Sequence, residues 1–429
     1  GMAIRIHGST TLQLDDNTAI FNDDLAFGSG DESVSEVSGY LSLVFMGTRP
    51  VIQANVQTLN KLIDEVATRR DNKTLPRVYI EVDNGNGYYR SELTNCYIEA
   101  ASEYYDRIQR NAAPITLQFT RVNYWEGAET AVPLTNLNGS NNITGLNVYN
   151  RNDATGTAPN RKCNYVTIAG SSITGELPAP FRVEMVNNFN NTVRLGTLWM
   201  TQNVHSNPLS LDPNLAGYAN IIESGSAKTK TKYWTLSTAT LNACSGQWFK
   251  IMGGIATTHI DQSTWYSTAL YFPSGGTDLI MLQKSEEVAV TRDGIHDLGT
   301  LQIPPWNVGL EDQTSIDLVL YVRKTGGFWS ELSFAQLWPV TGFRELEPQG
   351  YGAAYGVRIA DDGMNDTVWT DGWAGGGRAG HYIGLGERGA LVPGRDQRLW
   401  FLQTGITGDI DAERVLSVKV FYRPRRMTI

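Results

Sequence analysis

Strands and tight turns alternate through residues 76–127, which read PRVYIEVDNGNGYYRSELTNCYIEAASEYYDRIQRNAAPITLQFTRVNYWEG. Near the start of this stretch, the apolar residues of VYIEV occupy every second position, which is the period of a half-buried strand. The Asn- and Gly-rich segment 83–87 can adopt the positive φ angles of a hairpin turn. Because the same alternation returns in ITLQFT at 115–120, the stretch predicts an antiparallel sheet.

One amphipathic helix is expected upstream of these strands, over residues 57–70. Its apolar positions recur at helical spacing and should face the sheet: Leu59, Leu62, Ile63 and Val66. Glu65 lies four residues before Arg69, where an ion pair on the helix surface would add a small stabilisation. The first domain should therefore be a β-rich unit with a single helix.

This order of elements is similar to a known family. A strand, one amphipathic helix, a hairpin and a strand reading ITLQFTR, followed by NYWEG, resembles the N-terminal domain of phage distal-tail and tail-tube-like proteins. The resemblance is confined to residues 2–127. It implies a domain that joins sheets edge to edge into a ring around a channel. The expected partners are then further copies of this chain, with a hexamer among the options, and other tail proteins.

Length and composition restrict the class of protein further. At 429 residues the chain is too long for one ordinary hydrophobic core, so several domains are expected. Its 43 glycines and 18% charged residues are typical of many short strands joined by turns. The net charge of −9 argues against a general nucleic-acid-binding surface, because phosphate binding needs clustered Lys and Arg. We therefore predict a mainly β fold and no nucleic-acid partner.

Domain boundaries follow from shifts in composition along the chain. Residues 2–127 form the tail-type β domain, and 128–162, rich in Asn, Thr and Gly, is interpreted as a linker. Residues 220–345 contain short apolar runs spaced by Gly and Pro, which predicts a β-sandwich of the jelly-roll type. The β-rich segments 163–219 and 346–429 flank it. One arrangement left open is that they form a single discontinuous domain into which the sandwich is inserted.

Signals for membranes and secretion are missing. No apolar run approaches the ~20 residues of a membrane-spanning helix, and no basic-then-apolar signal peptide opens the sequence. We expect synthesis in the cytoplasm, no membrane partner and, for a phage protein, a final place in the virion tail. The locally basic end, 423–426, is interpreted as solvated or as a contact with an acidic partner.

The three cysteines do not form a recognisable site. Cys96, Cys163 and Cys244 are too few and too widely spaced for a disulfide framework or a zinc site. Buried reduced thiols are the expected state.

Tryptophans provide the candidate binding residues of the sandwich. Aromatic faces can stack on the apolar faces of sugar rings, although a buried tryptophan in a sandwich core is the more common case. The predicted sandwich contains Trp234, Trp248, Trp265, Trp306, Trp329 and Trp338. Trp306 follows a double proline and Trp329 follows a pair of glycines, so both are expected in loops. These two are the predicted carbohydrate-binding residues, with a cell-surface glycan as the partner.

A metal site is suggested only weakly. Asp361, Asp362 and Asp366 place several oxygen ligands within a short segment, which makes them weak candidates for calcium. The ligand order of an EF-hand and its bidentate glutamate are missing. A solvated turn is the preferred interpretation.

Catalysis and cofactors are not expected. His296 beside Asp297, like His259 near Asp261, is interpreted as a surface histidine rather than half of a catalytic pair. The glycine-rich stretch 375–380 matches a dinucleotide-binding pattern, but no helix-forming segment follows to hold the phosphate. With neither HExxH nor GxSxG in the chain, no catalytic residue and no cofactor are assigned.

Two functions from different classes remain. The preferred one is a structural component of a phage or prophage tail that self-assembles through its first domain and carries β-sandwich modules for glycan adhesion. The alternative is a secreted carbohydrate-binding or polysaccharide-degrading protein in which the first domain is an appendage. The absence of a signal peptide and of catalytic motifs favours the first. A monomer in solution that hydrolyses glycans would favour the second.

Overall fold

The computed structural model describes residues 3–15, 19–25, 34–100, 111–141, 145–150, 156–158, 161–189, 194–205, 221–224, 229–237, 246–257, 263–271, 280–303, 315–324, 329–350, 352–372, 381–411 and 413–429. In these ranges the chain is mainly β with one α-helix, which confirms the predicted fold class. None of the helical structure in these ranges is long and apolar enough to cross a membrane.

Two compact units divide the chain. Unit 1 contains residues 1–130, 174–179 and 423–429, and unit 2 contains residues 131–173 and 180–422. The chain therefore crosses from one unit to the other four times. Such connectivity differs from two domains joined by one linker, because several separate segments must all fold to complete unit 1.

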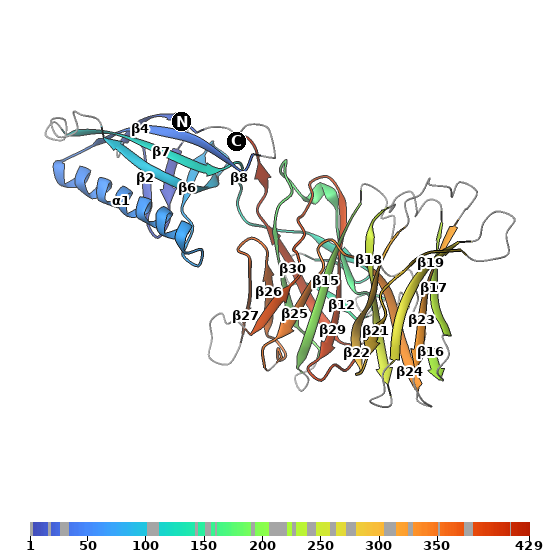
Figure 1. Cartoon of the computed structure of the whole chain (residues 1–429). Helices are drawn as coiled ribbons and strands as arrows, with labels where there is room; N and C mark the ends of the chain where they lie inside the picture. The colour runs from blue at the N-terminus through green and yellow to red at the C-terminus, as the bar shows by residue number, and fades with distance from the viewer. Residues whose placement is uncertain are drawn as a thin grey trace. The chain divides into compact units, whose positions relative to one another are not determined.

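A curved antiparallel sheet forms the main part of unit 1 (Figure 1). Its main path runs through β2 (Thr11–Leu14), β1 (Ala3–His7), β5 (Tyr79–Asp83), β6 (Tyr88–Ala100), β7 (Ala112–Val122), β4 (Glu36–Met46) and β3 (Ala19–Asp24). Burial alternates along β4 and β7, because successive side chains of a strand point to opposite faces. The alternation quoted from the sequence therefore predicted β7 correctly, whereas β5 has the predicted position but is buried on both faces instead of one.

The helix α1 (Arg49–Asp71) packs on the apolar face of this sheet. Leu59, Leu62 and Val66 are buried, as predicted, and Ile63 packs against the same core. Ile52 is also buried in the N-terminal part of the helix, a contact that the predicted range 57–70 did not include.

The predicted start of the helix was wrong. The helix begins at Arg49 because Pro50 lies in its first turn, where a missing N–H removes no helical hydrogen bond. Glu65 and Arg69, which were predicted to pair on the helix surface, also bond to other groups. Glu65 accepts a hydrogen bond from the Ser9 backbone N–H at 3.2 Å, and the Arg69 guanidinium donates to the Leu75 carbonyl at 2.9 Å.

The C-terminus completes unit 1. β31 (Arg425–Arg426) pairs with β8 (Trp125–Glu126). The Glu126 carboxylate lies 3.4 Å from the guanidinium of Arg90 and 3.5 Å from that of Arg425. Arg425 also lies over the Tyr124 ring, 3.9 Å from its centroid. The basic end is therefore folded into the sheet, which corrects its interpretation as a solvated or partner-binding segment.

Unit 2 contains a sandwich of two antiparallel sheets, which we call the host sandwich. Its seven-stranded sheet has the order β11 (Gly139–Asn141), β10 (Leu134–Asn136), β13 (Tyr165–Ile168), β29 (Asp396–Gly405), β15 (Leu195–His205), β25 (Arg344–Pro348) and β28 (Tyr382–Leu385). Its six-stranded sheet has the order β12 (Leu146–Tyr149), β30 (Val415–Tyr422), β14 (Phe181–Asn187), β26 (Arg358–Asp362) and β27 (Thr367–Asp371), with β9 (Thr130–Ala131) beside β30. A short 3-10 helix, η1 (Gly170–Ser172), lies between β13 and β14 in the sequence.

The interval 128–162 is not a linker, which corrects that prediction. It supplies β9 to β12, and Leu134, Leu146 and Val148 are buried. Asn136 does not mark a flexible connection, because its side chain bonds the backbone of neighbouring strands. The Asn136 amide donates to the carbonyls of Asn147 at 3.0 Å and Tyr165 at 3.1 Å.

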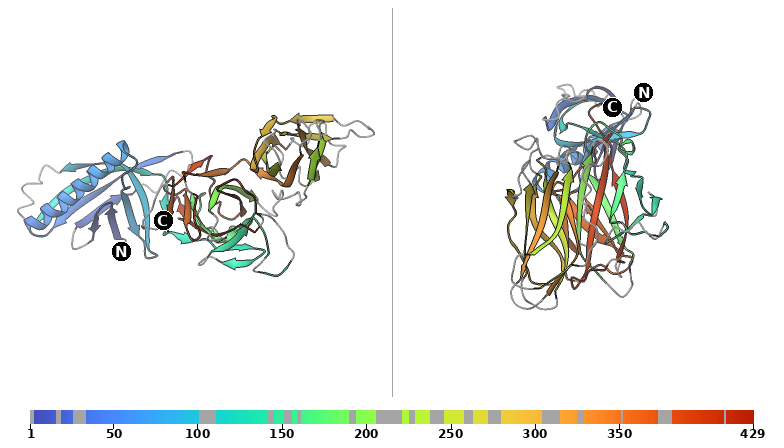
Figure 2. Two further views of the ribbon diagram at one scale, coloured as in Figure 1. Left: turned by 90° about the horizontal axis from the view of Figure 1, so that it is seen from below. Right: turned by 90° about the vertical axis from the view of Figure 1, so that its right-hand side faces the viewer.

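A second sandwich, which we call the insert, lies between β15 and β25 in the sequence. One of its sheets has the order β16 (Ile221–Ser224), β24 (Trp329–Pro339), β18 (Trp248–Thr257) and β22 (Gly294–Gln302). The other has the order β17 (Thr229–Ser237), β23 (Ser315–Lys324), β19 (Ser263–Tyr271) and β20 (Ile280–Lys284), with β21 (Val288–Val290) beside β19. The left view of Figure 2 shows the yellow-to-orange strands of the insert and the strands of the host as two separate groups.

The insert packs against the host through a mixed apolar and polar contact. Met252 and Trp338 of the insert belong to one buried cluster with Trp199 and Trp400 of the host. Beside this cluster, the Asn164 amide of the host donates to Gln336 Oε1 of the insert at 2.9 Å. The boundary of the insert is thus a packed interface within unit 2.

Candidate functional site

A cavity of about 400 Å³ lies where the insert meets the host sandwich, and we call it the junction cavity. The host contributes residues of β15, β25 and the segment 404–408, and the insert contributes residues of β18 and the segment 292–297. This volume falls within the range of small-molecule sites in proteins, roughly 300–1,000 Å³.

Strand register places the polar side chains of the host wall on one face. Trp199 of β15 is directly opposite Glu345 of β25, and Leu198 is opposite Leu346. Because side chains alternate between the two faces of a sheet, Leu198 and Leu346 are buried while Glu345 and Glu347 line the cavity. The short sequence RELEP thus presents two carboxyl groups side by side.

The two carboxyl groups share a hydrogen bond. Burial, together with the hydrogen bond and negative charge of the neighbouring Glu347, raises the pKa of Glu345 to about 7. Trp199 donates a side-chain hydrogen bond to Glu345 and thereby opposes part of this shift. The Thr197 hydroxyl donates to Glu347 Oε2 at 3.0 Å. At pH 7 Glu345 is therefore about half protonated.

The insert supplies the opposite wall. Lys250 Nζ lies 2.7 Å from Asp297 Oδ2 and 4.9 Å from the centroid of the Phe343 ring. His296 Nε2 lies 2.9 Å from the Arg292 carbonyl oxygen. Burial lowers the pKa of His296, so this imidazole is neutral at pH 7. His296 and Asp297, interpreted from the sequence as surface residues, thus both line the cavity.

Glu345 and Glu347 do not have the arrangement of a glycosidase acid pair. The two acids of a glycosidase flank the scissile bond at about 5–9.5 Å from each other. Glu345 and Glu347 instead share a hydrogen bond and lie on the same wall. In the described ranges, no group of three or more His, Cys, Asp or Glu side chains is arranged to hold a metal ion.

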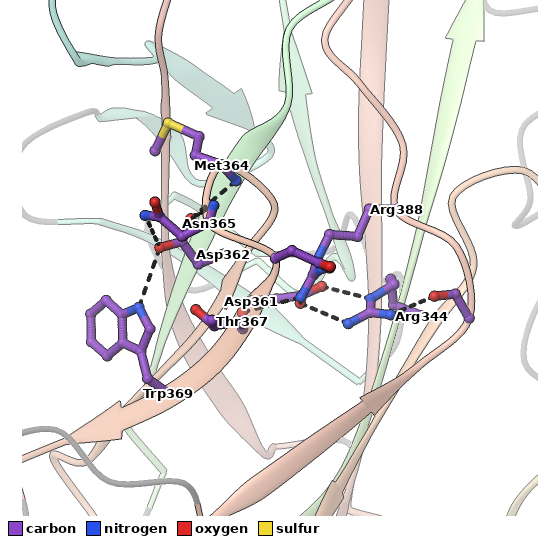
Figure 3. A network of polar contacts seen from close by, with 10 residues as sticks. Arg344, Asp361, Asp362, Met364, Asn365, Thr367, Trp369 and Arg388 are labelled. Carbon is purple, nitrogen blue, oxygen red and sulfur yellow. Dashed lines mark hydrogen bonds and ion pairs between the residues drawn. The ribbon is translucent and has the colours of Figure 1, made fainter. Parts of the chain in front are cut away.

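A second polar cluster lies between β25, β26 and the turn before β27 (Figure 3). The buried Asp361 carboxylate receives two hydrogen bonds from Arg344, at 2.9 and 3.0 Å, and two from Arg388, at 3.0 and 3.1 Å. Arg388 also contacts Asp366, which is 91% exposed. The calcium candidates Asp361 and Asp366 are therefore engaged by guanidinium groups.

Asp362, the third calcium candidate, caps the turn that follows it. Its Oδ1 accepts the backbone N–H groups of Met364 at 3.1 Å and Asn365 at 3.2 Å, and its Oδ2 accepts the Asn365 side-chain amide at 2.9 Å (Figure 3). The Trp369 indole N–H also points to Oδ2, at 3.5 Å. These contacts make the segment a well-ordered turn of a β-hairpin.

One of the two predicted glycan-binding tryptophans, Trp329, has a different position from that expected. Trp306 lies outside the described residues. Trp329 is the first residue of β24 and pairs with Ser224, so it lies in a strand rather than in a loop. Trp248, which begins β18, is 52% exposed, whereas Trp338 is fully buried. The sequence contained no local signal that separated Trp248 from the buried tryptophans.

The described cysteines are not reactive centres. Cys96 and Cys163 are buried free thiols. Burial raises the pKa of both, that of Cys96 to about 12, so each stays a protonated thiol at neutral pH. Cys244 lies outside the described residues.

Comparison with known proteins gives only remote similarity. No family model matches the chain, and no curated protein matches it. Among solved structures, the chain is similar to the baseplate of phage p2 in its activated conformation with strontium, with a TM-score of 0.27, 10% identity and coverage of 79% of this chain and 97% of that chain. For the same baseplate with calcium, the TM-score is 0.26 and the identity 11%, with coverage of 77% of this chain and 97% of that chain. For infectious bursal disease virus of the Gt strain, the TM-score is 0.16 and the identity 9%, with coverage of 70% of this chain and 82% of that chain. TM-scores this low do not establish a shared fold.

Proposed function

We propose that this chain is a structural component of a phage or prophage tail that self-associates through unit 1 and uses the insert for glycan adhesion. The strand order of the insert carries this proposal. Its two sheets, β16-β24-β18-β22 and β17-β23-β19-β20, have the order expected of a jelly roll. Jelly rolls recur as capsid and lectin domains, which suits an attached recognition module.

Self-association follows from the edges of the unit 1 sheet. β2 and β3 end its main path, and in the described part of the chain each pairs on one side only. An edge strand presents free N–H and C=O groups that can pair with a second chain. Repeating one such contact with a fixed rotation closes a ring.

The mechanism is association rather than catalysis. The chain crosses between unit 1 and unit 2 four times, so a mechanical force on one unit is transmitted through several segments instead of one linker. This connectivity suits a scaffold that must hold a recognition module in place. The shared hydrogen bond of Glu345 and Glu347 also disfavours the alternative of a polysaccharide-degrading enzyme.

Sedimentation velocity over a wide concentration range tests self-association. Replacing Gln13 of edge strand β2 by Lys should weaken association, because a charged edge resists pairing with another strand. The matched control is Gln57→Lys on the exposed side of α1, which should sediment like the unmodified chain. Equal association of both variants would refute pairing through β2.

Glycan arrays test the adhesive role. If the insert binds a glycan through its predicted tryptophans, Trp306→Ala or Trp329→Ala should abolish retention without lowering the melting temperature. Trp248→Ala extends the set to the ring that is exposed. If the unmodified chain is retained by no glycan, the adhesive role is refuted and the assembly role stands alone.

A further inference from the structure

We propose that the junction cavity binds an amino sugar, with its ammonium group held by the carboxyl pair Glu345 and Glu347. This inference rests on the proposed glycan adhesion and names the chemical class of ligand. It assigns recognition to the boundary between host and insert, rather than to an exposed tryptophan.

The charges in the cavity favour a cation. Four carboxyl groups line it, namely Asp293, Asp297, Glu345 and Glu347, against the two cations Lys250 and Arg292. Lys250 is already paired with Asp297 at 2.7 Å. His296 adds no positive charge at neutral pH, because its burial lowers its pKa. An ammonium group would therefore be attracted to the host wall, where both carboxyls lie.

The carboxyl pair is held in place for such a contact. Thr197 donates to Glu347, and Trp199 donates to Glu345, so both side chains are oriented by β15. An ammonium group has three donors and no acceptor, which matches two carboxyl groups that accept. A hydrogen bond to a charged carboxylate is also stronger than one between neutral groups.

The rest of the lining suits a hydroxylated ring. The segment Thr404–Gly408 and Gly196 line the cavity, and this segment contains Thr404 and Thr407. A threonine hydroxyl can both donate and accept, as sugar hydroxyls require. Trp199, Phe343 and Ile406 add apolar surface, which the faces of a sugar ring can contact. A divalent metal is a poorer fit, since no metal-holding cluster is present among the described residues.

Binding should release a fraction of a proton. Without ligand, Glu345 is about half protonated at pH 7, because burial and the neighbouring Glu347 raise its pKa to about 7. A bound ammonium group favours the doubly ionised pair, and the displaced proton goes to solvent. The charged groups that face the pair are Asp297, Asp293, Arg292 and Lys250 of the insert, together with the neutral His296. Burial lowers the pKa of His296, so this imidazole is not expected to take up the released proton.

Titration calorimetry with the full chain tests the proposal. The probes are a glucosamine tetramer, its fully N-acetylated form and Nα-acetyl-lysine amide, at pH 7 in two buffers with different ionisation enthalpies. We expect the glucosamine tetramer to bind with release of a fraction of one proton. The N-acetylated tetramer has no ammonium group and should bind at least about tenfold more weakly. The lysine derivative, which has no sugar ring, should also bind more weakly.

Two variants assign the contact to the pair. Glu345→Gln should weaken binding of the glucosamine tetramer about tenfold and abolish proton release, because the shared titration is lost. Glu387→Gln changes an exposed carboxylate outside the cavity and should leave both unchanged. Equal melting temperatures of the two variants would show that the comparison concerns binding and not folding.

The outcomes separate this inference from the proposed adhesion. Equal binding of both tetramers, or unchanged binding by Glu345→Gln, would overturn the amino-sugar site while glycan adhesion stands. Equal binding of the lysine derivative would overturn recognition of the sugar ring. If no glycan binds at all, both the adhesion and this inference are refuted.

Discussion

Replacing Asp361 by Asn should destabilise unit 2 by about 3–5 kcal/mol, the usual effect of removing one partner from a buried ion pair. The Asp361 side chain is 2% exposed and that of Arg344 is 5% exposed. The carboxylate accepts four hydrogen bonds of 2.9–3.1 Å from Arg344 and Arg388. Asparagine has a similar shape but no charge, and its amide group would face guanidinium donors. Two guanidinium groups would then lose their shared counter-charge, one of them deep in the protein.

Guanidinium chloride unfolding, followed by tryptophan fluorescence, measures the change. The matched control is Asp366→Asn, because Asp366 contacts the same Arg388 but is 91% exposed. Exposed ion pairs contribute about 0–1 kcal/mol, so this control should stay close to the unmodified chain. If Asp361→Asn and Asp366→Asn lower the free energy of unfolding equally, burial does not explain the contribution of Asp361 to stability. That result would refute the prediction.

A double variant checks the physical cause. Replacing Arg344 by Met in the Asp361→Asn background removes the buried cation that has lost its partner. We therefore expect the second substitution to recover part of the lost stability, whereas Arg344→Met alone should destabilise unit 2. Simple addition of the two single effects would contradict a shared buried pair.

Three further predictions concern α1, the C-terminus and the junction cavity. Leu62→Ala should destabilise unit 1 by about 2–5 kcal/mol, because Leu62 is buried against the sheet, while Lys61→Ala on the exposed side should have little effect in the same denaturation assay. Deleting residues 423–429 should increase hydrogen exchange in β8 and in 174–177, since β31 and the contacts of Arg425 with Glu126 and Tyr124 are lost; unchanged exchange would show that the C-terminus does not stabilise unit 1. The free energy of unfolding should fall as pH rises from 4.5 to about 7, because over that interval the raised pKa of Glu345 lets the native state bind more protons than the unfolded chain. Comparing Glu345→Gln with the unmodified chain at pH 5 and pH 7.5 checks this, since the variant should lack that part of the slope.

Local patterns in the sequence were enough for the elements of unit 1. Alternation at 115–120 predicted β7, and helical spacing predicted that Leu59, Leu62 and Val66 are buried. These predictions succeeded because one face of the strand or helix packs on the core, so buried residues recur with the period of that element. The alternation at 78–82 gave the position of β5 but not its burial on both faces. The start of α1 was missed because a proline can either end a strand or open a helix, and the sequence pattern did not distinguish these.

Pairing with other strands determined the structure of segments whose composition alone predicted loops or solvated ends. The composition of the Asn- and Gly-rich interval 128–162 predicts a loop, yet its short strands pair with β13, which follows the interval, and with β30, which lies far along the chain. Likewise, Arg425 reads as part of a solvated basic end until β31 reaches β8. Composition describes a segment alone, whereas a short strand is stable only through the neighbours that satisfy its hydrogen bonds.

The candidate site depends most on tertiary structure. Alternation in RELEP puts Glu345 and Glu347 on one face once β25 forms, but no strand was predicted at this position. The sequence did not determine that Trp199 and Thr197 of β15 orient them, or that Lys250 and Asp297 of the insert lie across the cavity. Those positions are separated by dozens of residues or more, and only the packing of two sandwiches brings them together. The raised pKa of Glu345 has the same origin, because burial and a second negative charge are properties of a folded surface and not of a sequence motif.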